Sequence, residues 1–116
     1  SPRASSIAWQ TDLDAALEES RRSGRLVFVD FSADWCPPCI VMKHDVWPDP
    51  AVERAMLSFV PVLVDVDSNQ AVAERYGVQG IPTILVLDST GRVVRRASYL
   101  SAAALVRYLA DAQQAP

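Results

Sequence analysis

Residues 29–39 read VDFSADWCPPC, and this stretch decides the fold. Its first residues continue a run from Leu26 that is apolar at successive positions, as in a strand buried on both faces. Its last residues place Cys36 and Cys39 at the start of a predicted helix. The two prolines between them fall in the first turn, where backbone N–H groups have no helical partner. A buried strand that leads into Cys-x-x-Cys at a helix start is a specific signal of a redox-active dithiol.

The spacing of the two cysteines gives each thiol a different task. Thiolate, rather than thiol, is the nucleophile. If Cys36 sits just before the helix, unpaired backbone N–H groups and the positive end of the helix dipole stabilise its thiolate. Cys39 lies about one turn further on, near enough to attack a mixed disulfide formed at Cys36. We therefore predict Cys36 as the attacking thiol and Cys39 as the resolving thiol.

Two plainer interpretations of the cysteines stay open at this point, a zinc-binding module and an inert buried pair. A zinc site usually has four ligands, and only His44 can join the two thiols as a nitrogen or sulfur ligand; otherwise we expect His44 to be a solvated helix residue. An iron–sulfur cluster typically needs four cysteines, and c-type haem attachment needs histidine where Ile40 stands. We expect no metal and no dissociable cofactor, because the Cys36–Cys39 disulfide is itself the redox group.

Length and composition predict one domain over residues 1–116, with flexible tails at 1–8 and 113–116. The chain has 116 residues, of which 50% are hydrophobic, enough for one core. Its net charge is −3 and it contains no basic run, so nucleic acid is not an expected partner. No apolar run approaches the ~20 residues that span a bilayer. Because the chain lacks an initiator Met, we expect it to be a processed form or an excised domain.

The hydrophobic pattern predicts alternating helices and strands. Thr11 is the expected cap of the first helix, and a hairpin turn over 89–91 is expected near the end of the chain. Helices that alternate with buried strands predict a mostly parallel sheet covered on both faces, and the hairpin adds an antiparallel edge. Helices are predicted over 11–24, 36–46, 49–57, 68–77 and 101–112, and strands over 25–32, 59–67, 83–88 and 92–97.

A family resemblance follows from these motifs. VDFSADWCPPC, together with YGVQGIPTILVLDSTG at 76–91, resembles thioredoxin over about 26–109. The longer stretch FSADWCPPCIVMKHDVWPDPAVERAM at 31–56 narrows the resemblance to the C-terminal thioredoxin-like domains of DsbD-type disulfide reductases. The resemblance implies an α/β thioredoxin fold, in which a central mixed sheet is flanked by helices on both faces. The extra N-terminal helix is compatible with the DsbD branch.

The resemblance also implies roles for residues around the dithiol. Cys36 matches the exposed nucleophile, Cys39 the buried resolving cysteine, and Trp35 the tryptophan that packs beside them; without the motif, Trp35 reads as a core aromatic. Asp30 matches an aspartate buried beneath the dithiol. A carboxyl group in an apolar strand has a raised pKa and can exchange protons with Cys39. The plainer alternative for Asp30 is a side chain that reaches solvent or a cap.

A second group of residues matches the loop that faces the dithiol. The Ile81–Pro82 bond matches a cis peptide bond, and the backbone of Ile81 is expected to pair with an extended substrate segment. The alternative is an ordinary trans proline that opens a strand. Two positions depart from thioredoxin: Leu63 replaces a strand lysine near the buried aspartate, and Ser98 replaces a glycine that lines the substrate groove. We therefore expect altered proton handling at Asp30 and a narrower or more polar groove.

The sequence thus predicts a thiol–disulfide oxidoreductase that reduces protein disulfides. No histidine stands between the cysteines to stabilise a thiolate, which favours a reductase over the alternative, an oxidase or isomerase. A noncatalytic protein-binding domain is the alternative from another class. The resemblance implies substrates with disulfides, a membrane or soluble redox partner that restores the dithiol, and a periplasmic location in bacteria, with the cytoplasm as the alternative. We expect a monomer.

Overall fold

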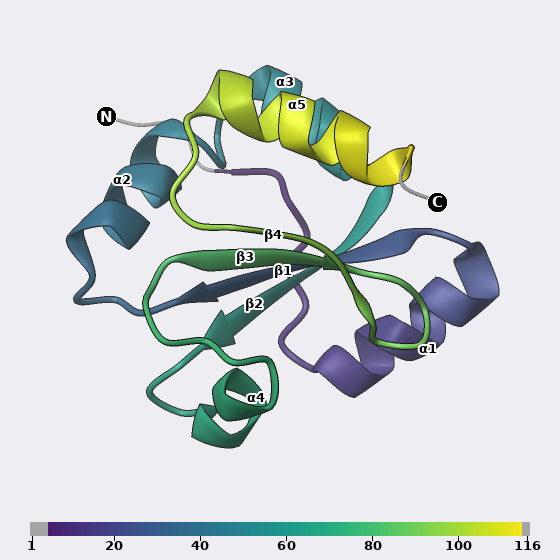
Figure 1. Ribbon diagram of the computed structural model, residues 1–116. Coiled ribbons are helices and arrows are strands. Elements are labelled where there is room, and N and C mark those ends of the chain that lie inside the picture. The colour runs from purple at the N-terminus through teal and green to yellow at the C-terminus, as the bar shows by residue number, and fades with distance from the viewer. Residues whose placement is uncertain (1–4, 115–116) are drawn as a thin grey trace.

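Four strands form one sheet in the order β2-β1-β3-β4 in the computed structural model, which describes residues 5–114 (Figure 1). The sheet is mixed, as the thioredoxin resemblance implied. Within the described residues, no helix has both the length and the apolar character needed to cross a bilayer. The strands are β1 (Leu26–Ser32), β2 (Phe59–Asp65), β3 (Thr83–Leu87) and β4 (Val93–Ala97).

The prediction of a mostly parallel sheet is wrong. Only β1 and β2 pair in parallel, whereas β3 is antiparallel to both β1 and β4. The reason lies in the connection from β2 to β3, which holds the six-residue helix α4 (Gln70–Arg75). This connection stays at the end of the sheet where β2 finishes, so β3 starts there and runs back (Figure 1). The alternating pattern predicted α4 to be a crossover helix between parallel strands. Its six residues are too few for such a crossover.

Helices cover both faces of the sheet, so the central strands are buried on two sides (Figure 1). Helices α1 (Leu13–Ser23) and α4 cover one face. Helices α2 (Pro37–Asp45), α3 (Pro50–Met56) and α5 (Ala102–Gln113) cover the other. The sheet has a hydrophobic core on each face, and alternate side chains of β1 point into one or the other. Phe28 packs toward α2 and α5, and Val29 packs toward α1. Asp30 points to the same face as Phe28, beneath α2.

The starts of α1, α2, α3 and α5 follow local capping rules, with one correction, whereas α4 has no capping side chain. Asp12, rather than the predicted Thr11, caps α1, because its Oδ1 accepts the backbone N–H of Ala15 at 3.2 Å. Ser101 caps α5 in the same way. Gly24 ends α1 with φ of 78°, a left-handed conformation that glycine adopts at little cost.

The chain before α1 lies against the domain, which corrects the predicted tail at 1–8 for its last four residues. The Ser5 hydroxyl donates to the Trp47 carbonyl at 3.0 Å, and Ile7 packs against the core. Gln10 pairs with Val62 beside β2 as a short parallel bridge. At the other end, residue 113 belongs to α5 and not to a tail. Residues 1–4 and 115–116 of the predicted tails lie outside the described residues.

Replacing Asp49 by alanine is expected to lower the free energy of unfolding by about 1 kcal/mol. Asp49 Oδ1 accepts the backbone N–H groups of Ala51 at 2.9 Å and Val52 at 3.2 Å, and both N–H groups lose this partner in the variant. Urea unfolding followed by circular dichroism measures the change. Asp45→Ala is the matched control, since Asp45 is exposed at the end of α2 and its side chain has no partner within the described residues. Equal losses in the two variants would contradict the capping role.

Candidate active site

Cys36 is the residue that caps α2. Its backbone is extended, with φ of −84° and ψ of 114°, and the following two prolines occupy the first turn of the helix. Cys36 Sγ accepts the backbone N–H of Cys39 at 3.3 Å. The sulfur therefore lies at the positive end of the helix dipole, where a thiolate is stabilised. This placement confirms the predicted position of Cys36 just before the helix.

Cys36 and Cys39 are joined as a disulfide, with their Cα atoms 5.2 Å apart. The prediction of an exposed Cys36 is wrong for this oxidised form, because Cys36 is only 2% exposed and Cys39 5%. Ala33, Val66 and Ile81 pack around the disulfide. The burial of Cys39 agrees with the prediction. Access to Cys36 Sγ therefore lies between these apolar neighbours.

Trp35 lies on the surface, which excludes its interpretation as a core aromatic. Its side chain is 64% exposed, and its indole Nε1–H donates to the Asp67 carboxylate at 2.8 Å. This hydrogen bond links the loop before α2 to the turn after β2. Ile40 and Val41, in the first turns of α2, are also exposed. Exposed apolar side chains thus flank the dithiol in sequence, a feature typical of protein contact surfaces.

The Ile81–Pro82 peptide bond is cis, as the resemblance implied. The Ile81 carbonyl oxygen lies 3.7 Å from Cys36 Sγ, so this loop faces the dithiol. Two hydroxyl groups hold the loop: Thr83 donates to the Gly80 carbonyl at 2.6 Å, and Ser98 donates to the Pro82 carbonyl at 3.1 Å. The Ser98 hydroxyl is therefore already hydrogen-bonded to the loop that faces the dithiol.

Asp30 is buried beneath the dithiol and is 3% exposed. Burial raises its pKa to about 7, because the carboxylate loses its hydration. Within residues 5–114, no protein group forms a hydrogen bond with its Oδ1. The burial of Asp30 argues against the alternative in which its side chain reaches solvent, and its Oδ1 caps no helix within these residues. A carboxyl group in this state can take up or release a proton near neutral pH.

A pocket of about 740 Å³ joins Asp30 to Cys39, and we call it the α2 pocket. Lys43, His44 and Leu63 are among the other side chains that line it. The sequence predicted His44 to be a solvated helix residue unless it binds zinc, and it did not identify Lys43. A signal was present, since Lys43 follows Cys39 by four residues and so lies on the same helix face. Leu63 stands where thioredoxin has a lysine, so the part of the pocket wall that β2 contributes is apolar.

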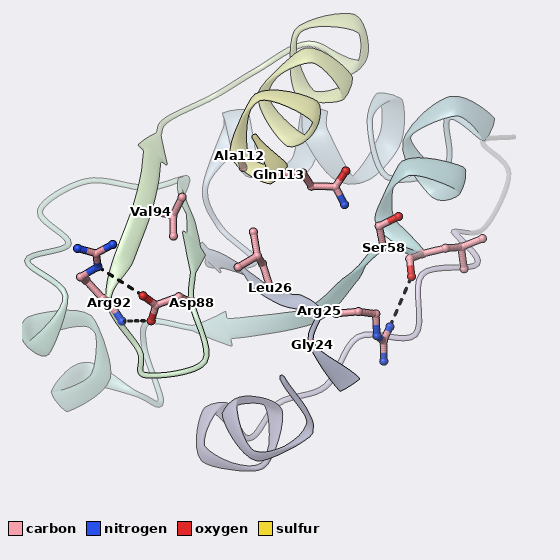
Figure 2. Close-up of a pocket in the computed structure, with 10 residues that line it drawn as sticks. Gly24, Arg25, Leu26, Ser58, Asp88, Arg92, Val94, Ala112 and Gln113 are labelled. Carbon is pink, nitrogen blue, oxygen red and sulfur yellow. Dashed lines mark hydrogen bonds and ion pairs between the residues drawn. The ribbon is translucent and has the colours of Figure 1, made fainter. Parts of the chain in front are cut away.

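A second pocket, of about 850 Å³, lies at the other end of β1 and contains none of the predicted site residues (Figure 2). Its charged groups already have partners. Arg92 pairs with Asp88 at 3.4 Å, and Arg25 pairs with Glu19 at 2.6 Å. Because the cysteines are absent from its wall, this pocket does not take part in the dithiol chemistry.

The structure also bears on the zinc alternative. Within residues 5–114, no three His, Cys, Asp or Glu side chains are grouped in a way that could hold a metal ion. The cysteine pair is closed as a disulfide, and thiolate is the form that binds zinc. That the protein needs no metal and no cofactor stays a prediction.

Comparisons with known proteins agree with this geometry. A family described as Thioredoxin-like matches residues 8–89. Thioredoxin H4 of Arabidopsis thaliana is 38% identical over 86 residues, covering 74% of this chain and 66% of that protein. Thiol:disulfide interchange protein DsbD 1 of Pseudomonas aeruginosa is 36% identical over 92 residues, covering 72% of this chain and 16% of that protein. This chain therefore spans about two thirds of the first relative and a small part of the second.

A solved structure supports the narrower resemblance. The oxidised DsbD C-terminal domain of Neisseria meningitidis aligns with a TM-score of 0.75 and 28% identity, over 90% of this chain and 98% of that one. A thioredoxin fold with a Cys-x-x-Cys disulfide is the arrangement of a thiol–disulfide oxidoreductase. The chain belongs to the thioredoxin-like family, and its relatives within that family include the DsbD thiol:disulfide interchange proteins.

Proposed function

We propose that this protein reduces disulfide bonds in other proteins through its Cys36–Cys39 dithiol. One observation carries the proposal: the disulfide closes at the N-terminus of α2, directly opposite the Ile81–Pro82 loop. There the helix dipole favours the thiolate of Cys36, and the loop offers a backbone beside it for an extended segment of substrate.

The reaction proceeds in two exchanges. The Cys36 thiolate attacks one sulfur of the substrate disulfide, forms a mixed disulfide and expels the other substrate sulfur as a thiolate, which takes a proton from water. Cys39 then gives its proton to the Asp30 carboxylate and attacks Cys36 Sγ. The Cys36–substrate bond breaks as the Cys36–Cys39 bond forms, and the second substrate thiolate is protonated. The substrate gains two electrons and the protein dithiol loses two.

We infer a reducing direction because, beyond the N-terminus of α2, few groups stabilise the Cys36 thiolate. A strong oxidant is one whose reduced, dithiol form is stabilised. The hydrogen bond that Cys36 Sγ accepts comes from the Cys39 N–H, and the intervening prolines have no N–H to add. No imidazole stands between the cysteines. Weak stabilisation of the thiolate favours a reducing dithiol.

The partners of this reaction are protein substrates and a second redox protein. Trp35, Ile40 and Val41 expose apolar surface beside the dithiol, which suits contact with proteins. Resemblance to DsbD supports a periplasmic location in a bacterium and a membrane partner that restores the dithiol; the cytoplasm is the alternative. We propose that the protein acts as a monomer, without metal or dissociable cofactor.

The equilibrium reduction potential of the Cys36–Cys39 pair tests the direction. We expect a value near about −270 mV, as in thioredoxin. The protein would be equilibrated in defined dithiol buffers, and the reduced fraction measured by alkylation and mass shift. A value near about −120 mV, that of the oxidant DsbA, would overturn the reductase and make the protein a disulfide donor.

A further inference from the structure

Ser98 stands directly after β4, beside the loop that faces the dithiol. The antiparallel register pairs Ala97 with Ile84, so one further step along the two strands brings Ser98 to the start of β3. Its hydroxyl donates to the Pro82 carbonyl at 3.1 Å. Ser98 is nevertheless exposed, so its side chain can be shortened without opening a cavity in the core.

This hydroxyl links the loop to another strand of the sheet. Within residues 5–114, the backbone of residues 79–82 accepts hydrogen bonds from two hydroxyl groups, those of Thr83 and Ser98. Thr83 closes a turn within the loop itself, since its partner is the carbonyl of Gly80, three residues earlier. Ser98 comes from the end of β4. Its hydrogen bond therefore fixes the loop relative to the rest of the sheet.

Holding the Pro82 carbonyl also limits the orientation of Ile81. The peptide unit that joins the two residues is planar, and the proline ring fixes φ of Pro82. Only ψ of Pro82 therefore remains free between the plane of the Ile81 carbonyl and the carbonyl that Ser98 holds. The Ile81 carbonyl oxygen lies 3.7 Å from Cys36 Sγ. The Ile81 N–H has no hydrogen-bond partner within the described residues, so it is open to a partner from another molecule.

We propose that Ser98 is a positioning residue, which holds the backbone of Ile81 in the orientation that pairs with an extended polypeptide beside the dithiol. The inference rests on the proposed function and names the substrates that Ser98 favours, disulfides carried on a polypeptide backbone. Ser98 acts on the binding of such substrates and not on the sulfur chemistry, because its hydroxyl is bonded to Pro82 and not to a sulfur atom.

Two disulfides of different chemistry test this role, since insulin presents a polypeptide backbone and bis(2-hydroxyethyl) disulfide has none. The protein is reduced, freed of reductant and mixed with each disulfide, and its oxidation is followed by alkylation and mass shift. We expect Ser98→Ala to lower the ratio of the two rate constants, insulin over the small disulfide, about fivefold, the size that the loss of one hydrogen bond predicts.

A matched control and a conservative variant accompany this measurement. Ser89→Ala is the control, because Ser89 lies in the hairpin turn between β3 and β4 and its hydroxyl has no partner within the described residues. Its ratio of rate constants is expected to equal that of the wild type. Ser98→Thr keeps a hydroxyl and is expected to retain the wild-type ratio. The reduction potential of Ser98→Ala is expected to match that of the wild type, because the contacts of the sulfurs are unchanged.

The outcomes separate the positioning role from the proposed function. An unchanged ratio in Ser98→Ala, an equal fall in Ser98→Thr or Ser89→Ala, or a shifted reduction potential in Ser98→Ala would overturn the positioning role alone. A reduced wild-type protein that reacts with neither insulin nor the small disulfide would overturn the proposed function, and the role of Ser98 with it.

Discussion

Replacing Cys36 by serine is expected to abolish disulfide reduction, whereas replacing Cys39 by serine is expected to trap the substrate. Cys36 Sγ lies at the N-terminus of α2, where backbone dipoles stabilise its thiolate, and serine provides no comparable nucleophile at neutral pH. In Cys39→Ser the first exchange still occurs, but the thiol that resolves the mixed disulfide is missing. The covalent complex should therefore accumulate.

Insulin reduction with a dithiol reductant measures turnover, and non-reducing electrophoresis shows the trapped complex. The double variant Cys36→Ser/Cys39→Ser is the control and should trap nothing. Accumulation of the complex in Cys36→Ser instead of Cys39→Ser would reverse the assigned roles. If the wild type binds proteins without turnover and Cys36→Ser binds them equally well, the protein is a noncatalytic binding domain.

Replacing Asp30 by asparagine is expected to stabilise the protein at pH 8 and to slow the resolving exchange. Burial raises the pKa of Asp30 from 3.8 to about 7. Between these values the unfolded chain releases the Asp30 proton while the folded protein keeps it, so wild-type stability falls as the pH rises. The penalty is complete above about pH 7 and is on the order of 4 kcal/mol. Asparagine carries no charge and avoids it.

Urea unfolding at pH 4 and pH 8 measures this effect on stability. The gain from Asp30→Asn should be present at pH 8 and almost vanish near pH 4, close to the pKa of 3.8 in the unfolded chain, where the two states differ little in bound protons. The same variant should slow release from the mixed disulfide by about 10²-fold at pH 7, the size typical of a lost general base. Asp34→Asn, an exposed neighbour, is the control. A pH-independent gain would contradict the raised pKa.

The sequence predicted most of the fold because the residues that mark the starts of its helices and the apolar runs of its strands are strong signals. Cys36, Asp49 and Ser101 each precede a helix that begins where the pattern indicated, and the buried strands are apolar at successive positions. It failed on the direction of β3, since apolar periodicity reports burial and not strand orientation. Orientation depends on where the short connection through α4 returns the chain.

The sequence predicted which residues form the site, but it predicted less well how exposed they are and which pockets lie beside them. The Cys-x-x-Cys motif and the Ile81–Pro82 segment located the two parts that meet at the dithiol, 3.7 Å apart. The low exposure of Cys36 was missed, because it depends on Val66 and Ile81, which lie far away in sequence. The α2 pocket was missed for the same reason, since its wall combines α2, β2 and the chain before α1.

The bridge between Gln10 and Val62 also protects one edge of the sheet. It occupies part of the outer edge of β2, which would otherwise offer unpaired backbone groups to a neighbouring molecule. At the opposite edge, β4 carries Arg95 and Arg96, whose charges discourage strand-to-strand aggregation. Because both edges of the sheet are protected, the pairing with an extended substrate segment that we propose would fall to the backbone of the Ile81 loop, beside the disulfide.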